Sequence, residues 1–165
     1  MSTPMFAVSV ALVNGTNLLT GVIIDPIHKN EFFATSGSGA FCNGIPIASG
    51  NKGKAVPAIF LNHGYQREDK NRFVEITRRL SLDYSLRKLG TTALEICYVA
   101  EGCFDGFICS GDEIWDYAAG VLIAREAGCV FSGWQGQPWD GKNSFILVAR
   151  PEIHRHLADK IRDLC

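Results

Sequence analysis

The residues best suited to chemistry lie in the segment Trp115-Asp116-Tyr117-Ala118-Ala119-Gly120. Its periodicity predicts a helix from Ile114 to Ala127, with a buried stripe made of Trp115, Ala118, Ala119, Leu122 and Ile123. Asp116 falls off that stripe in the first helical turn, where unpaired N–H groups favour a carboxylate. Spacing alone therefore favours a charge that stabilises the helix end, and the alternative is a metal ligand.

A second segment with binding potential is Gly90-Thr91-Thr92, which precedes another predicted helix. Thr92 and Glu95 have the spacing of a capping box, in which each side chain satisfies an N–H group at the helix start. The sequence therefore predicts a capped helix N-terminus at this point.

The elements that position these segments fall into two parts. The first part reads as an antiparallel β meander, with strands at 6–13, 18–25, 31–35 and 40–47 and turn residues between them. The second part alternates strands at 56–61, 84–88, 104–108, 129–132 and 144–149 with helices at 66–80, 92–102, 114–127 and 151–164. This order predicts an α/β domain with a mixed sheet and with sites at the carboxyl ends of its strands. We place the subdomain boundary within 48–55, giving a partial β subdomain (1–52) and an α/β subdomain (53–165).

The composition sets limits on partners and location. Of 165 residues, 47% are hydrophobic and 20% are charged, and the net charge of −1 includes no basic block. We therefore expect neither nucleic acid nor a membrane as a partner. No basic residue precedes the apolar run from Met5 to Val13, so we expect a cytoplasmic protein rather than a secreted one. The six cysteines form no Cys-x-x-Cys pair, which favours reduced thiols.

Three segments together resemble the inositol monophosphatase family. The first is Trp115 to Gly128 and the second is Gly39 to Ile47. The third is Leu89 to Leu94, together with Val99-Ala100-Glu101-Gly102 and Asp105-Gly106, which follow it in the chain. The likeness extends in order over nearly the whole chain. It implies a layered αβαβα fold and a magnesium-dependent hydrolase of small phosphate monoesters, such as inositol or sugar phosphates. It also implies that Asp116 binds Mg²⁺ and that Gly90, Thr91 and Thr92 face the substrate.

The sequence departs from the family pattern in two respects. The other metal-binding motifs of the family lie upstream of the strand that begins here at Phe6, which only five residues precede. We therefore expect an incomplete first layer, an uncovered face on the β meander, and a chain that is inactive or incomplete in isolation. Cys109 stands where the family often has a substrate-binding Glu, and a thiol is a poor acceptor. Asp112 and Glu113 either compensate or cap the next helix with Ser110, and capping is the favoured interpretation.

Two functions remain open at this point. One is the magnesium-dependent phosphatase, completed by an N-terminal segment. The other is a non-catalytic remnant that serves as a partner-binding or dimerising module. The resemblance implies a homodimer, and an uncovered sheet face favours self-association. The sequence does not select among the possible phosphate monoesters.

Overall fold

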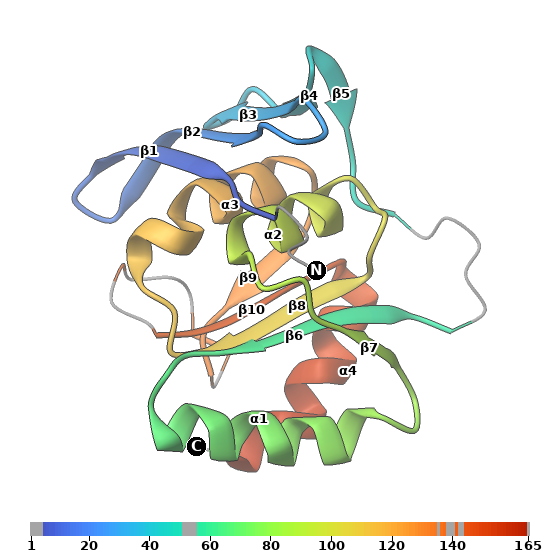
Figure 1. Ribbon diagram of the computed structural model, residues 1–165. Helices are drawn as coiled ribbons and strands as arrows, with labels where there is room; N and C mark the ends of the chain where they lie inside the picture. Colours follow the sequence, from blue (N-terminus) through green and yellow to red (C-terminus); the bar gives the residue numbers. More distant parts are fainter. Residues whose placement is uncertain (1–4, 51–55, 135, 138–140, 142–143, 165) are drawn as a thin grey trace.

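The chain folds into four alternating layers of sheets and helices (Figure 1). The computed structural model describes residues 5–50, 56–134, 136–137, 141 and 144–164. An outer antiparallel sheet lies over α2 and α3, these helices lie over a second sheet, and α1 and α4 cover its far side. This arrangement confirms the predicted α/β class. The described residues supply four of the five layers of the αβαβα order, without its first helical layer.

The outer sheet is the predicted meander. Its strands pair antiparallel in chain order: β1 (Val8–Asn14), β2 (Asn17–Asp25), β3 (Asn30–Thr35), β4 (Ala40–Cys42) and β5 (Ile45–Ile47). The predicted strand over 40–47 is a hairpin of two short strands, because the chain turns at Asn43-Gly44.

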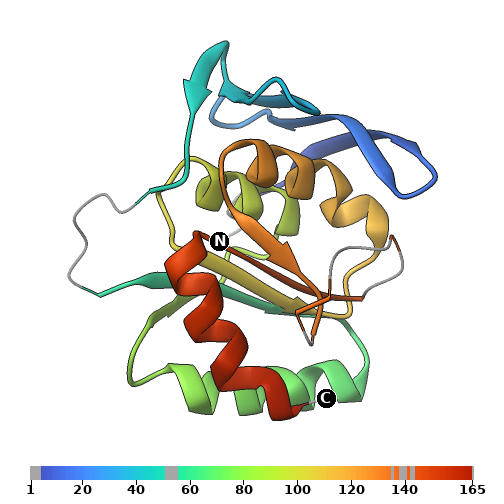
Figure 2. The same cartoon turned by 180° about the vertical axis from the view of Figure 1, so that it is seen from behind.

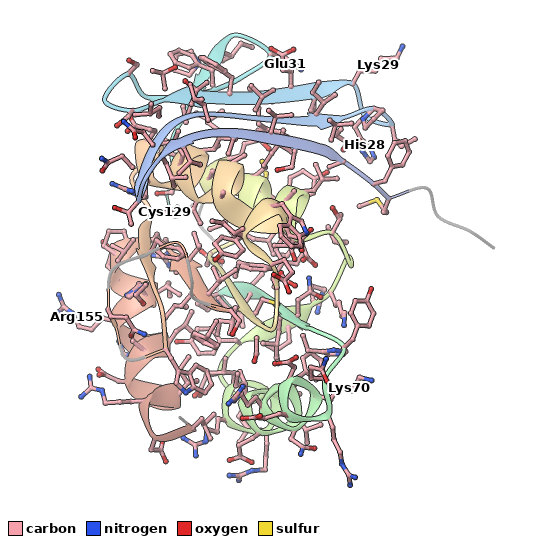
Figure 3. The ribbon with its side chains drawn as sticks, turned by 90° about the vertical axis from the view of Figure 1, so that its left-hand side faces the viewer. His28, Lys29, Glu31, Lys70, Cys129 and Arg155 are labelled. Carbon is pink, nitrogen blue, oxygen red and sulfur yellow. The ribbon has the colours of Figure 1, made fainter. Side chains whose placement is uncertain are left out.

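One face of this sheet packs on the helices and the other faces solvent. A continuous cross-strand row on the solvent face runs Val10, Val22, Phe33, Phe41, Pro46. Val10 at one end of the row is 60% exposed. Figure 3 shows Lys29 and Glu31 at the same outer layer, at the end near the β2–β3 turn. The expected uncovered apolar face is thus present.

The second sheet is mixed, as predicted. It comprises β6 (Ala58–His63), β7 (Ser85–Arg87), β8 (Gly106–Ser110), β9 (Val130–Ser132) and β10 (Phe145–Ala149), in the order β7-β6-β8-β10-β9. β6 is parallel to β7 and β8, whereas β10 runs antiparallel to both of its neighbours. β8 begins at Gly106 rather than Phe104, whose ring stacks on Phe60 at 3.8 Å between centroids.

Four α-helices complete the layers: α1 (Arg67–Leu80), α2 (Thr92–Ala100), α3 (Ile114–Glu126) and α4 (Pro151–Ile161), the last followed by a 3₁₀ turn at Arg162–Leu164. The predicted buried stripe on α3 is wrong at Trp115, which is 69% exposed. Because α3 lies between two sheets, every residue from Tyr117 to Ala124 is buried, and no single stripe exists. Only the two ends of the helix reach solvent, at Trp115 and Asp116 in the first turn and at Arg125 in the last.

A close backbone contact sets the distance between α3 and the outer sheet. A Cβ atom placed on Gly21 of β2 would lie 2.9 Å from the carbonyl oxygen of Ala119 and 3.0 Å from its Cα. A Cβ atom placed on Gly120, one residue after Ala119, would lie 3.1 Å from the Cβ of Ile96 on α2. The small residues of this segment therefore allow the close approach that the sequence predicts.

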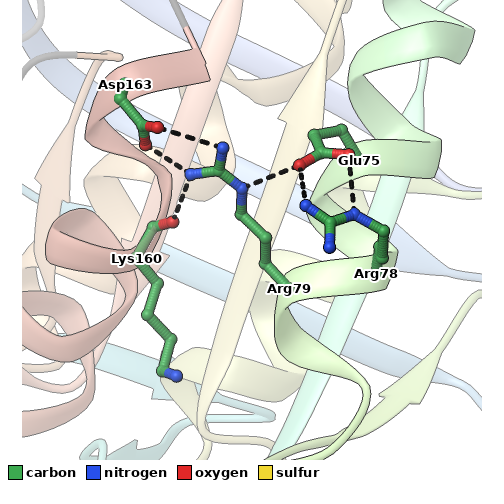
Figure 4. Close-up of polar contacts among 5 residues, drawn as sticks. All are labelled: Glu75, Arg78, Arg79, Lys160 and Asp163. Carbon is green, nitrogen blue, oxygen red and sulfur yellow. Dashed lines mark hydrogen bonds and ion pairs between the residues drawn. The ribbon is translucent and has the colours of Figure 1, made fainter.

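The two helices on the far side are joined by an ion-pair network (Figures 2 and 4). The Arg79 guanidinium on α1 donates to the Lys160 carbonyl at 3.0 Å and binds the Asp163 carboxylate. It also donates to Glu75 Oε1 at 3.0 Å, and Arg78 binds the same carboxylate. Arg79 thus connects α1 to the C-terminal segment, whereas the contacts of Arg78 lie within α1.

One buried cluster unites the two parts of the chain. It includes Ile23 and Phe32 of the outer sheet together with Phe60 and Phe107 of the second sheet. The outer sheet ends with Ile47 and the second sheet begins with Ala58, so the predicted boundary falls between them. Residues 51–55 of that stretch lie outside the described residues. The division into two subdomains stays a prediction. No helix among the described residues has the length and apolar character needed to cross a membrane.

Candidate functional site

A cleft of about 840 Å³ opens at the carboxyl ends of β6 and β8. Its lining comes from the chain around Met5–Ser9, the β6–α1 connection, the residues at 90–93 and the residues at 111–116. Parallel strands that end beside each other, each followed by a helix, place loops and helix N-termini at one edge of the sheet. The cleft therefore brings together Gly90, Thr91, Thr92 and Asp116, which the sequence identified as candidates in two separate segments.

The start of α2 forms one wall of this cleft. Thr91 is the N-cap and Thr92 the first helical residue, so the predicted Thr92–Glu95 capping box is wrong. The Thr92 hydroxyl instead donates to the Asp112 carboxylate on the loop before α3. This bond joins the two helix starts across the cleft, and the first-turn N–H groups of α2 have no partner within the helix itself.

Asp116 lies in the first turn of α3 on the opposite wall. Its Oδ2 accepts a hydrogen bond from the Glu113 N–H at 3.3 Å, and Glu113 is the N-cap of the helix. Partial desolvation and the nearby charges of Asp112 and Glu113 raise the pKa of Asp116. This geometry agrees with the prediction that Asp116 is a charge at a helix end. The Asp116 side chain is also exposed, so its carboxylate faces the cleft.

The charge in the cleft is mainly negative. The lining includes five carboxylates and two basic side chains: Glu68, Asp69, Asp112, Glu113 and Asp116 against Arg72 and Lys88. Such a field attracts a divalent cation and repels a bare phosphate. Anion binding here therefore depends on helix N–H groups, on the two cations or on a bound metal ion.

Cys109 lies beneath the cleft. It is fully buried on β8, opposite Asn62 of β6 in the strand register, and it is not one of the lining residues. Burial, reinforced by the charge of Asp112, raises the pKa of its thiol well above the usual range. Cys109 is thus a neutral thiol at neutral pH, and its role in substrate binding stays a prediction.

Glu95, which the sequence analysis assigned only to a capping box, and Asn62, which it did not single out, form a polar contact at the wall formed by α2. Glu95 is fully buried, and its Oε1 accepts the Leu89 N–H at 2.6 Å and the Gly90 N–H at 3.3 Å. Its Oε2 accepts from the Asn62 side-chain amide. Burial raises the pKa of Glu95, while the two backbone donors act in the opposite direction. Glu95 therefore holds the loop before α2 in place. A carboxylate inside an otherwise apolar helix was the available sequence signal.

Asp69 connects the two strand-end loops. It is buried in the first turn of α1, and its Oδ1 accepts from the Ser110 hydroxyl at 2.9 Å. A side chain at Gly111 would collide with its carboxylate, and the Gly64 N–H donates to the Ser110 carbonyl at 2.6 Å. The Asp69 carboxylate therefore positions the loop that carries Asp112 and precedes α3.

A metal ion needs more ligands than the described residues provide. No group of three or more His, Cys, Asp or Glu side chains that could hold a metal ion occurs among them. Asp116 and Asp112 offer hard oxygen atoms, but Asp112 already accepts the Thr92 hydroxyl. Asp116 is one ligand at most and does not form a magnesium site alone.

Comparison with known proteins agrees with this fold. The family model of the inositol monophosphatase family matches residues 1–164, so the chain belongs to that family. An inositol-1-monophosphatase from Mesorhizobium japonicum is 32% identical over 162 residues, which are 96% of this chain and 61% of the relative. The Nus factor SuhB from Pasteurella multocida is 32% identical over 166 residues, with the same coverage of both chains. The chain thus spans about three fifths of the length of these relatives.

Solved structures show the same fold. The extragenic suppressor protein SuhB from Bartonella henselae superposes with a TM-score of 0.88 at 30% identity, covering 97% of this chain and 62% of that structure. Inositol monophosphatase from Anabaena gives a TM-score of 0.85 at 27% identity, covering 95% of this chain and 66% of the other. The layered fold seen here is therefore that of the matching part of these proteins.

Proposed function

We propose that the chain is a part of a magnesium-dependent phosphatase that acts on small phosphate monoesters, such as inositol or sugar phosphates. The observation that carries this proposal is the convergence of Gly90-Thr91-Thr92 and Asp116 on one cleft from two different helix starts. A helix N-terminus favours a phosphate, and an exposed carboxylate favours a hard cation. The relatives named inositol monophosphatases support the same substrate class.

In this proposal the chain's own residues bind and orient the substrate. The first-turn N–H groups of α2 face the phosphate, and the Glu95 carboxylate holds the preceding loop. Asp116 supplies one carboxylate to a magnesium ion, which would polarise the phosphate when bound. Because the described residues do not complete a metal site, we propose that the isolated chain does not turn over substrate. Cytoplasmic location and homodimerisation are parts of the same proposal.

Magnesium binding tests the role of Asp116. Titration calorimetry should show weak Mg²⁺ binding to the cleft through Asp116, and Asp116→Asn should weaken it by at least about tenfold, because the variant loses the only carboxylate assigned to the ion. The matched control is Glu68→Gln, which removes an exposed carboxylate of the same cleft from the helix α1. Equal affinities of the two variants would contradict the assignment of Asp116.

Hydrolysis of inositol monophosphate tests the activity. We expect no magnesium-dependent phosphate release by the purified chain. Turnover that Asp116→Asn abolishes would show that the isolated chain is an active enzyme, and it would refute the proposed inactivity while supporting the site.

A second candidate is a dimerising module without catalysis. The apolar row from Val10 to Pro46 on the outer sheet favours it, because an exposed apolar face of this kind is typical of an interaction surface. We expect sedimentation velocity to show self-association that Val10→Lys weakens. A monomer at all concentrations would exclude this candidate and would also refute the homodimer of the first proposal.

A further inference from the structure

Asn62 is an unusual residue at the inner end of the cleft. It follows the apolar residues of β6, is only 6% exposed and lines the cleft. Within the described part of the chain, its Oδ1 is buried and has no hydrogen-bond partner. Buried amide oxygens are rarely left unpaired, since the lost bond to water is not replaced. An unpaired acceptor at the wall of a cleft indicates a place for a donor from a ligand.

The orientation of this amide is determined by Glu95. The Asn62 Nδ2 donates to Glu95 Oε2, while Glu95 Oε1 accepts the Leu89 and Gly90 N–H groups. A turned amide would place Asn62 Oδ1 against a carboxylate oxygen, and two acceptors repel each other. Because the two ends of a planar amide diverge, Oδ1 is directed away from Glu95.

We propose that Asn62 is a specificity-determining residue that accepts a hydrogen bond from a hydroxyl group of a polyol phosphate. This inference rests on the proposed phosphatase function and names the part of the site that recognises the alcohol. A phosphate dianion has no proton to donate, so the donor must come from the rest of the ligand. Cys109, the neighbour of Asn62 in the strand register, carries a thiol that is a weak acceptor. Asn62 provides the stronger acceptor at this place.

One hydrogen-bond network holds both ends of such a ligand. Glu95 binds the loop that precedes the phosphate-facing turn of α2, and the same carboxylate binds the amide that faces the hydroxyl. The cleft, at about 840 Å³, has room for a six-membered ring and a phosphate. A ligand that has a hydroxyl at the right distance from its phosphate therefore satisfies both ends together.

The test compares two ligands that differ only in their hydroxyl groups. Inositol 1-phosphate and cyclohexyl phosphate share a six-carbon ring, and only the first can donate to Asn62. Calorimetric titration of the full chain in the presence of magnesium should give at least about tenfold tighter binding of inositol 1-phosphate. Asn62→Ala should reduce this ratio about five- to tenfold, because any loss that passes through Glu95 to the phosphate-facing turn weakens both ligands alike. The matched control is Gln66→Ala, because Gln66 is an exposed amide residue of the same cleft.

A second measurement on the unmodified chain does not depend on the folding of a variant. The side-chain amide signals of Asn62 in a ¹⁵N correlation spectrum should shift clearly more with inositol 1-phosphate than with cyclohexyl phosphate. Equal shifts with both ligands, or an unchanged affinity ratio in Asn62→Ala, would overturn the inference and leave the phosphatase proposal standing. If neither ester nor inorganic phosphate binds, both proposals fail.

Discussion

The contact between β2 and α3 makes Gly21→Ala a sensitive test of the layered packing. The added methyl group would lie 2.9 Å from the Ala119 carbonyl oxygen and 3.3 Å from the Ala119 carbonyl carbon. These are backbone atoms in the middle of a buried helix, so they cannot move aside as a flexible side chain can. The layers must separate slightly, and the loss spreads over the buried cluster that they share.

The expected loss follows from two opposing effects. Overpacking of a dense core costs about 1–3 kcal/mol, whereas replacing Gly by Ala stabilises by about 0.4–1 kcal/mol through the unfolded chain. We therefore expect Gly21→Ala to lower the free energy of unfolding by about 1–2 kcal/mol and the melting temperature by about 2–8 °C. Urea unfolding, monitored by circular dichroism, measures the change in the free energy of unfolding. The control is Gly50→Ala, where a Cβ atom meets nothing within 4 Å. Equal midpoints for the two variants would refute the contact.

Two further predictions concern charged groups. Arg79→Ala should lower the urea midpoint more than Arg78→Ala does, because only Arg79 links α1 to Asp163. Equal urea midpoints for the two variants would contradict this link. Burial, together with the charge of Asp112, raises the pKa of Glu95 above its usual 4.5. Its contribution to stability is therefore fully present below about pH 4.5 and is lost as the pH rises through the raised value, because the unfolded chain releases that proton first. Urea midpoints measured from pH 4 to 7 should fall less steeply for Glu95→Gln, and parallel curves would contradict this prediction.

Most of the fold could be predicted from the sequence, because local patterns decide it. Alternation and turn residues located the meander, and strands separated by helices predicted the mixed second sheet. The prediction of a stripe on α3 was wrong for a physical reason. Periodicity assumes one buried face, but a helix between two sheets is buried on all sides, as Gly120 and Val121 are here. Trp115, which the pattern assigned to the core, lies beyond the sheets and lines the cleft.

The candidate site could be predicted only in part, because its key contacts join distant segments. Asp116 and Gly90-Thr91-Thr92 were found from their own neighbours in the sequence, since a helix start is a local feature. The bond between Asn62 and Glu95 spans 33 residues, and that between Thr92 and Asp112 spans 20. No sequence period or motif predicts that such pairs meet. They come together because β6 and β8 run parallel and end side by side. The orientation of Asn62 follows in turn from the two backbone donors that hold Glu95, so the acceptor in the cleft is a property of the fold and not of any one segment.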